Sequence, residues 1–297
     1  MLARQKIRAV LFGVLPAVIL LAACSTAIDD IQQDPIGIQA PKAPVSTESS
    51  TTAAAEVNME ITPVEAGKSS TTPPSAQGER SGIELRGPGL SYQSMILADG
   101  SKLEFALLLP EDFNPAQFYP VLLALPPGPQ SLDMVEAGLS SYWTPGSAGR
   151  DWIVVSPIAP GGRLFFQGSE RQLTEFIEVI IRELRVEGDR LHLAGISNGG
   201  ISAFRIAILQ PELFHSMVVL PGFPADQDFS RLDRLREMRV VMFVGEMDTT
   251  WVEEMKKAQE ELERLQVNST LEIVPGNGHF ISNISGEQIF SLLDSYR

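Results

Sequence analysis

The chain is 297 residues long, 44% of its residues are hydrophobic, and its formal net charge is −14. This composition allows one sizeable core with segments appended to it, and the negative charge disfavours nucleic acid and anionic lipid as partners. Cys24 is the only cysteine, which excludes a disulfide within the chain and a cysteine nucleophile or thiolate metal cluster in the folded part.

The first residues have the order of an export signal. Three basic residues precede an apolar run over residues 10–22, and small residues then lead to Cys24. The run is shorter than the roughly 20 residues of a membrane-spanning helix, and it contains Pro16. We therefore expect residues 1–23 to be a cleaved signal peptide rather than a membrane span.

The segment that ends at Cys24, Leu21-Ala22-Ala23-Cys24, resembles the lipobox of bacterial lipoproteins. The resemblance implies that Cys24 is acylated and becomes the mature N-terminus. The next residue, Ser25, resembles the residue that follows the lipidated cysteine in lipoproteins retained at the outer rather than the inner membrane. We therefore expect a lipid-anchored protein of the cell envelope, outside the cytoplasm, at the outer membrane or the cell surface.

Residues 25–79 are dominated by Ser, Thr, Pro and Ala and show no sustained apolar period. Such a composition cannot bury enough apolar surface to offset the entropy of ordering the chain. We predict that residues 24–80 are a disordered linker that carries the lipidated cysteine, and that residues 81–297 form the folded domain.

The folded part begins with a predicted hairpin. Residues 92–97 and 103–109 are its strands, and Asp99-Gly100 between them supplies the positive φ of a tight turn. Uniformly apolar runs, typical of strands buried on both faces, follow the hairpin. They cover residues 121–125, 152–156, 191–196, 217–220 and 240–244, and residues 271–274 form the last strand.

Amphipathic stretches alternate with these strands and predict helices. They cover residues 169–184, 201–209, 251–265 and 285–297. The first begins at Ser169 with Gln172 three positions on, the pattern of a capping box. The alternation predicts an α/β fold with helices on both faces of a mostly parallel, eight-stranded sheet. The segment between Leu220 and Val240 is too short for a large cap domain.

The strongest motif is Gly195-Ile196-Ser197-Asn198-Gly199, which fits the pattern G-x-S-x-G between a predicted strand and a predicted helix. A nucleophilic serine needs a sharp, strained turn at this point, where side chains at Gly195 and Gly199 would clash. Ser197 is therefore the candidate nucleophile. The alternative is a serine that only caps the helix.

A base is expected late in the chain, because the order of the catalytic residues in this arrangement is nucleophile, acid, base. His192 lies inside a predicted strand and His215 precedes one, so both are better explained as packed or surface histidines. His279 follows the last strand in a loop that contains glycine. His279 is therefore the candidate base.

The candidate acid is Asp248, which lies in the loop after the apolar run at 240–244. Glu246, two residues nearer the strand, is the alternative. Asp226 and Asp228 precede that strand and would need a different geometry.

Two backbone N–H groups are expected to stabilise the oxyanion that forms during acyl transfer. One belongs to Asn198, which follows the nucleophile at a helix N-terminus. The other belongs to the loop over residues 125–130, in which three prolines have no N–H. Gly128 is the first candidate in that loop and Gln130 the second.

Residues 189–200, around the G-x-S-x-G pattern, resemble the nucleophile segment of esterases of the α/β-hydrolase superfamily, such as polyhydroxybutyrate depolymerases, feruloyl esterases and dienelactone hydrolases. Residues 211–214 and the placement of Asp248 and His279 are similar to that group as well. The resemblance covers roughly residues 91–297 and implies the α/β-hydrolase fold. The relatives commonly have His-Gly where this chain has Pro126-Pro127, which predicts a differently shaped oxyanion loop.

These residues predict a serine hydrolase that cleaves carboxylic esters through an acyl-enzyme, on a small-molecule or polymer-borne ester such as acetylated or feruloylated carbohydrate. The same triad would also serve a peptidase or an acyltransferase, and a binding lipoprotein on the same scaffold is a third hypothesis. Aromatic residues after the strands are candidates for lining the site: Phe165, Phe166, Phe223 and Trp251. No metal-binding or nucleotide-binding pattern is present in the sequence, so no cofactor is expected.

Overall fold

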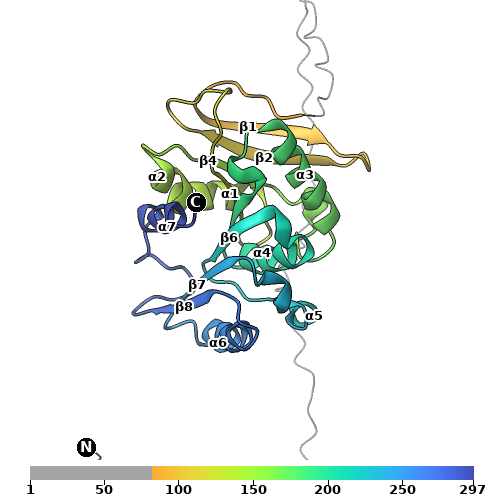
Figure 1. Cartoon of the computed structure of the whole chain (residues 1–297). Helices are drawn as coiled ribbons and strands as arrows, with labels where there is room; N and C mark the ends of the chain where they lie inside the picture. Colours follow the sequence, from red (N-terminus) through yellow and green to blue (C-terminus); the bar gives the residue numbers. More distant parts are fainter. Residues whose placement is uncertain (1–81) are drawn as a thin grey trace, which may run out of the picture. The chain divides into compact units, whose positions relative to one another are not determined.

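A computed structural model describes residues 82–297 of the chain (Figure 1). The predicted signal peptide, the predicted lipidation site at Cys24 and the predicted linker all lie outside the described residues. Among the helices of residues 82–297, none has the length and apolar character that a bilayer crossing requires.

One sheet of eight strands runs through the domain in the order β1-β2-β4-β3-β5-β6-β7-β8. The strands are β1 (Gly89–Ile96), β2 (Lys102–Leu109), β3 (Val121–Leu125), β4 (Ile153–Pro157), β5 (Leu191–Gly195), β6 (Phe214–Val219), β7 (Arg239–Gly245) and β8 (Ser269–Val274). β2 pairs antiparallel with β1 and β4, and all other neighbours are parallel. The predicted edge hairpin and the predicted mostly parallel, eight-stranded sheet are confirmed.

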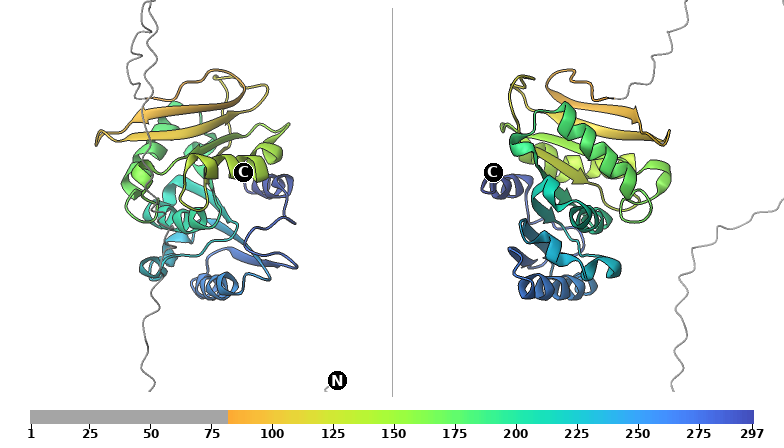
Figure 2. Two further views of the ribbon diagram at one scale, coloured as in Figure 1. Left: turned by 180° about the vertical axis from the view of Figure 1, so that it is seen from behind. Right: turned by 45° about the vertical axis from the view of Figure 1, so that its right-hand side comes forward.

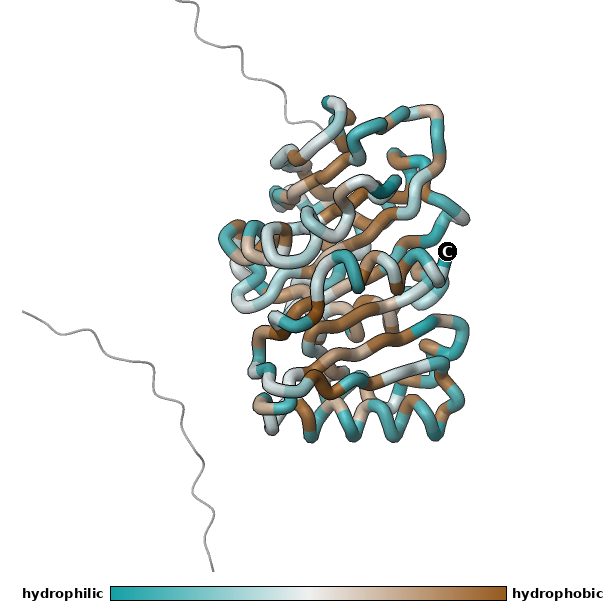
Figure 3. The backbone as a smooth tube through the Cα atoms, turned by 90° about the vertical axis from the view of Figure 1, so that its left-hand side faces the viewer, coloured by the Kyte–Doolittle hydropathy of each residue, from teal (hydrophilic) through white to brown (hydrophobic). Residues whose placement is uncertain are grey.

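The central strands β3, β4 and β5 are buried at every residue, as their uniformly apolar sequences predict for strands covered on both faces. Two hydrophobic clusters lie on opposite faces of the sheet, because neighbouring residues of a strand point to opposite sides. Leu123 and Leu193 belong to one cluster, and Leu122 and Ala194 belong to the other. Figure 3 shows the hydrophobic residues following the strands through the middle of the domain, with hydrophilic residues on the outer turns of the helices.

Helices cover both faces of the sheet (Figures 1 and 2), as predicted. They are α1 (Leu132–Gly138), α2 (Thr144–Ser147), α3 (Glu170–Glu183), α4 (Asn198–Leu209), α5 (Asp226–Phe229), α6 (Thr249–Arg264) and α7 (Gly286–Asp294). Buried residues of α3, α4 and α6 join the first cluster, and those of α1 and α7 join the second. Shorter turns are a π-helical segment at Leu139–Trp143 and 3₁₀ segments at Pro160–Gly162, Glu187–Asp189, Pro211–Leu213 and Leu232–Leu235.

The predicted capping box at Ser169 is wrong. The Ser169 side chain makes no cap hydrogen bond and donates instead to the carbonyl of Arg163 at 2.9 Å. The Gln172 side chain reaches away to Asp99, with Nε2 2.9 Å from Oδ2. The backbone of Ser169 (φ −122°, ψ 19°) departs from the extended conformation that a capping side chain usually needs.

Between β6 and β7 the chain contains only α5 and one 3₁₀ turn. Residues 82–297 therefore carry no large cap domain, as the short segment between Leu220 and Val240 predicts. The carboxyl ends of the parallel strands β5, β7 and β8 are left uncovered by such a domain, and the candidate catalytic residues follow these three strands.

Candidate active site

The turn between β5 and α4 has the strained geometry expected of a nucleophile. Ser197 has φ 55° and ψ −118°, a conformation that residues with a side chain rarely adopt. A Cβ on Gly195 would overlap the carbonyl of Gly199, and a Cβ on Gly199 would overlap the carbonyl of Leu125. The predicted clashes at both glycines are confirmed, and they explain why the turn needs glycine on each side of the serine.

The three residues proposed as a triad form one chain of hydrogen bonds. His279 Nε2 lies 2.8 Å from Ser197 Oγ, and His279 Nδ1 lies 2.6 Å from Asp248 Oδ2. The carboxylate can only accept, so Nδ1 carries the proton and Nε2 is free to accept from the serine hydroxyl. The side chain of Asp248 is only 14% exposed, whereas that of His279 is 47% exposed to solvent.

Two loops bring Asp248 and His279 together. Asp248 follows β7 and precedes the first residue of α6, and its loop is bonded to the loop after β8 by Met247 N–H, which donates to the Asn277 carbonyl at 2.9 Å. A Cβ on Gly245 would overlap the carbonyl of Gly278, so the loops approach more closely than a larger residue would allow. The close approach sets the distance between the carboxylate and the imidazole.

The alternative acids lie elsewhere. Glu246 Oε2 accepts from the backbone N–H of Gly276 at 3.1 Å and so helps to hold the loop that precedes His279. Asp228 is fully buried and pairs with Arg205 at 2.6 Å. Neither hydrogen-bonds to His279 in the described residues, and Asp248 is the carboxylate that does.

The structure separates the two candidates for the second oxyanion donor. The N–H of Gln130 donates to the carbonyl of Pro127 at 3.0 Å, and its side chain is fully buried. Gln130 as an oxyanion donor is therefore wrong, because its N–H already has an acceptor. The N–H of Gly128 has no acceptor among residues 82–297, and Gly128 has a φ of 54°, which glycine adopts without strain.

The first oxyanion candidate, Asn198, is the first residue of α4, where helix geometry leaves the N–H without an intrahelical acceptor. Its side chain also contacts the opposite loop, since Nδ2 donates to the Gly128 carbonyl at 2.9 Å. Both candidate donors thus belong to residues that are hydrogen-bonded to each other beside Ser197.

One of the four predicted aromatic residues contacts the triad, and a second packs against the first. The Trp251 ring meets the His279 ring edge-on with centroids 4.8 Å apart, and Phe223 contacts Trp251 at the same separation. Phe165 is fully buried in the core and does not line a site, which corrects that expectation. Phe166 is half-buried, with no ring contact to these residues within residues 82–297.

Sequence reasoning missed residues that border the site. Met247 and Phe280, the neighbours of Asp248 and His279 in the chain, are 64% and 58% exposed, and we call this exposed apolar pair the apolar rim. Tyr142 contacts Phe280 and donates its hydroxyl to the Ile281 carbonyl at 2.8 Å. Burial raises the pKa of Tyr142 to about 12, so the hydroxyl stays protonated and keeps this bond. No pattern in the sequence marks Tyr142, because its partner is far away in the chain.

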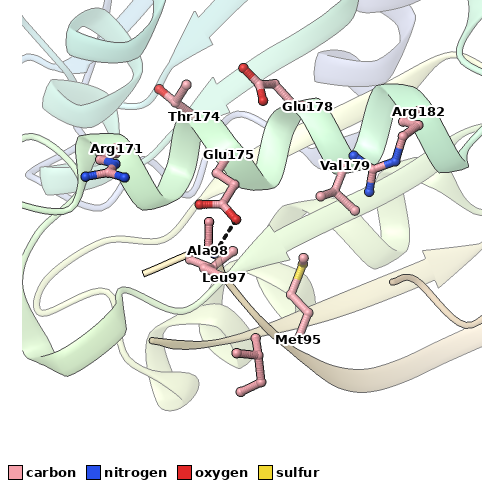
Figure 4. A pocket seen from close by; sticks show the side chains of 10 residues that line it. Met95, Leu97, Ala98, Arg171, Thr174, Glu175, Glu178, Val179 and Arg182 are labelled. Carbon is pink, nitrogen blue, oxygen red and sulfur yellow. Dashed lines mark hydrogen bonds between the residues drawn. The ribbon is translucent and has the colours of Figure 1, made fainter. Parts of the chain in front are cut away.

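A pocket of about 670 Å³ lies on another part of the domain, between the end of the hairpin and α3 (Figure 4). Arg171, Glu175 and Arg182 of α3 face Met95 and Leu97 across it, and Glu175 accepts from the Ala98 N–H at 2.6 Å. None of the candidate catalytic residues lines this pocket. In the part of the chain that the structure describes, no group of three or more His, Cys, Asp and Glu is placed to hold a metal ion.

No protein-family model and no curated protein matches the sequence. Similar solved structures include a thermostable esterase (16% identity, TM-score 0.54, covering 70% of this chain and 60% of that one). A putative dipeptidyl aminopeptidase IV from Bacteroides ovatus is 17% identical, with a TM-score of 0.57, and the match covers 70% of this chain and 35% of that one. A ferulic acid esterase is 20% identical, with a TM-score of 0.51, and the match covers 69% of this chain and 94% of that one. The chain therefore spans 60% of the esterase and about a third of the peptidase. These likenesses show that the chain has the α/β-hydrolase fold.

Proposed function

We propose that this chain is a serine hydrolase that cleaves carboxylic esters through an acyl-enzyme. The observation that carries the proposal is the continuous chain of hydrogen bonds from Asp248 through His279 to Ser197, at 2.6 and 2.8 Å. Serine is a weak nucleophile until an adjacent base takes its proton, and the base needs a partner that fixes its orientation and tautomer. The three side chains meet both requirements.

In the proposed reaction, Ser197 Oγ attacks the ester carbonyl carbon while its proton moves to His279 Nε2. Asp248 stabilises the imidazolium that forms. The carbonyl oxygen becomes an oxyanion, and the N–H groups of Asn198 and Gly128 donate to it. The C–O bond then breaks, His279 gives its proton to the leaving alcohol, and the acyl group stays on Ser197. Water then gives a proton to His279 as its oxygen bonds to the acyl carbon. The bond from that carbon to Ser197 Oγ breaks, His279 returns the proton to Oγ, and the acid leaves.

We propose esters that reach an open site as substrates, either small molecules or esters on a polymer. The absence of a cap domain in residues 82–297 and the apolar rim of Met247 and Phe280 support this, as does the likeness to a ferulic acid esterase. A screen of nitrophenyl esters by acyl length, together with release of acetate or ferulate from xylan, tests it. Turnover confined to charged, hydrophilic esters would contradict the apolar rim as a substrate contact.

A peptidase or an acyltransferase is the second candidate, because the triad does not determine the leaving group or the final acceptor. The likeness to a putative dipeptidyl aminopeptidase IV favours testing it. Product analysis with dipeptide anilides and with added alcohols as acceptors separates the three activities. Cleavage of anilides faster than of matched esters would replace the esterase proposal.

The test of the nucleophile is labelling with a fluorophosphonate, which bonds covalently to an activated serine. We expect labelling of the wild type at Ser197 and none of Ser197→Ala, with ester turnover reduced by at least about 10³-fold. Ser216→Ala is the matched control, because Ser216 is a fully buried serine that contacts His192. Equal labelling of wild type and Ser197→Ala would overturn the proposal, and no labelling of either would favour a binding protein on this scaffold.

We also propose that the chain is exported and anchored to the envelope through a lipid on Cys24. The order of residues up to Cys24 and its resemblance to a lipobox support this. Expression in a bacterium with labelled palmitate provides the test. A wild-type chain as unlabelled as Cys24→Ser would show the proposal to be wrong.

A further inference from the structure

The loop that supplies Gly128 has an unusual shortage of donors. Pro126, Pro127 and Pro129 have no N–H, so Gly128 is the only residue of 126–129 that can donate from its backbone. Gly128 and Gln130 both have positive φ, at 54° and 55°. Glycine is the least restricted residue, and a donor that must point at one position needs its orientation fixed from outside.

Gln130 fixes the far end of this loop. Its backbone N–H donates to Pro127 and its carbonyl accepts from Ala159 at 2.9 Å. Its buried side chain donates through Nε2 to the Pro126 carbonyl (3.3 Å) and to Ser202 Oγ (3.0 Å), and accepts through Oε1 from the Phe165 N–H (2.8 Å). Every donor of this residue has a partner, which makes the network rigid.

Ser202 connects Gln130 to the helix that follows the nucleophile. Ser202 Oγ accepts from Gln130 and donates to the Asn198 carbonyl at 2.9 Å. The Asn198 side chain in turn donates to the Gly128 carbonyl at 2.9 Å. Three hydrogen bonds therefore link Gly128 to Asn198, Asn198 to Ser202 and Ser202 to Gln130. The backbone from Gln130 to Gly128 closes them into a ring.

The ring holds both proposed oxyanion donors. Asn198 supplies one N–H and binds the residue that supplies the other, while Ser202 and Gln130 brace the two from behind. We infer that the Asn198 side chain and the buried pair Gln130 and Ser202 position the oxyanion hole, which lets a loop with three prolines act with a single backbone donor. This inference rests on the proposed function.

The experiment compares Asn198→Ala, Ser202→Ala and the double variant in the full chain. Each removes a side chain of the ring and leaves both backbone N–H groups in place. We expect kcat for nitrophenyl acetate to fall by about tenfold to a hundredfold in each single variant, with KM changed less than about twofold, because the oxyanion exists only in the transition state. The double variant should be little worse than the poorer single variant, since the ring is already open.

A second readout is the affinity for phenylboronic acid, to which Ser197 adds to form a tetrahedral adduct that places an oxygen in the oxyanion position. Its inhibition constant should rise by the same factor as kcat falls. Ser216→Ala is the control: it removes a fully buried serine hydroxyl that bonds to His192 at 2.8 Å, away from the ring, and should keep kcat and boronate affinity.

The outcomes separate the inference from the proposed function. Unchanged kcat in both single variants, or a loss of kcat with boronate affinity unchanged, overturns the inference while leaving the esterase intact. Equal losses in Ser216→Ala would show that general destabilisation, rather than positioning, explains the effect, and would also overturn it. A wild type without turnover or labelling that depends on Ser197 overturns both. If Ser202→Ala fails to fold, Asn198→Ala alone decides, because its half-buried side chain supports no core packing.

Discussion

His192 lies in β5, at the opposite end of the strand from Ser197, and is only 2% exposed. Its Nδ1 is 2.8 Å from Ser216 Oγ. Burial is the main reason why the pKa of His192 is lowered to about 3. The charges of His215, Arg297 and Arg190 also lower this pKa, and the charge of Asp294 acts in the opposite direction. In the unfolded chain the same imidazole binds a proton near pH 6.5. Protonation of His192 therefore leaves the free energy of unfolding unchanged above pH 6.5 and lowers it progressively as the pH falls toward 3.

This difference predicts how a substitution changes the response to acid. Between pH 6.5 and 4, His192 contributes a loss of up to about 1.4 kcal/mol per pH unit to the free energy of unfolding. His192→Asn removes that contribution, so its stability should fall less steeply than that of the wild type over this range. Urea unfolding at pH 7, 6, 5 and 4 measures both slopes. Equal pH dependence of the free energy of unfolding in the two proteins would mean that His192 binds a proton as readily in the native state as in the unfolded chain.

The residues of the site differ in how far the sequence predicts them. Chain order and the small number of histidines single out His279, and the structure places it between Ser197 and Asp248. The sequence could not exclude Gln130 as an oxyanion donor, because only the structure shows that its N–H donates to the Pro127 carbonyl within a turn. The hydrogen bond between Gln130 and Ser202 joins residues that are far apart in the chain, so no local sequence pattern predicts it.

At the scale of elements, the contact of α2 with α7 depends on two glycines. A Cβ on Gly286, at the start of α7, would overlap the Tyr142 carbonyl and lie 2.9 Å from Gly146 N. These neighbours are backbone atoms, which cannot rotate away as a side chain can. The close contact places α7 against the π-helical segment that contains Tyr142, and Tyr142 binds the carbonyl of Ile281, two residues after His279.

Gly286→Ala should therefore cost more than an ordinary helix substitution. We expect the free energy of unfolding to fall by about 1–3 kcal/mol or more, because the helices must separate to admit the methyl group. Gly278→Ala is the matched control, since a Cβ there meets no atom within 4 Å. Chemical denaturation of both variants measures the difference. A Gly286→Ala protein as stable as the Gly278→Ala protein would show that α7 shifts without loss of packing.

The elements also show why local patterns mislead. Ser169 and Ser285 are each followed by glutamine three positions on, yet only Ser285 forms a capping box, with bonds of 2.8 and 3.2 Å to Gln288. The hydroxyl of Ser169 is drawn to the Arg163 carbonyl instead. Helix α2 has only four residues and contains Pro145 and Gly146, so its sequence shows no helical period, and its contact with α7 stabilises it. Helix α1 is also short, and it packs Val135 into the second core cluster.

At the scale of the whole molecule, the first residues that the structure describes are already bonded to the folded domain. The Ile83 N–H donates to Glu183 Oε2 at 2.5 Å, and the Ile83 side chain packs against the larger core cluster. β1 then pairs with β2 along its full length. Met95 and Leu97 at the end of the hairpin strand are each 3% exposed. Gly82 and the residues after it are therefore tied into the sheet and its core, whereas the predicted start of the folded domain at residue 81 lies outside the described residues and stays a prediction.

A chain that begins at Gly82 should retain the fold and the proposed activity, with kcat/KM within about twofold of the full chain, because the triad and both core clusters lie beyond this point. A chain that begins at Ala98 should lose several kcal/mol of stability, since it lacks β1, exposes the edge of β2 and removes the buried Met95 and Leu97. Unfolding midpoints and ester turnover of the two truncated chains measure both effects. Equal stability of the two chains would mean that β1 contributes little, and a loss of activity in the longer one would assign a catalytic contribution to residues before 82.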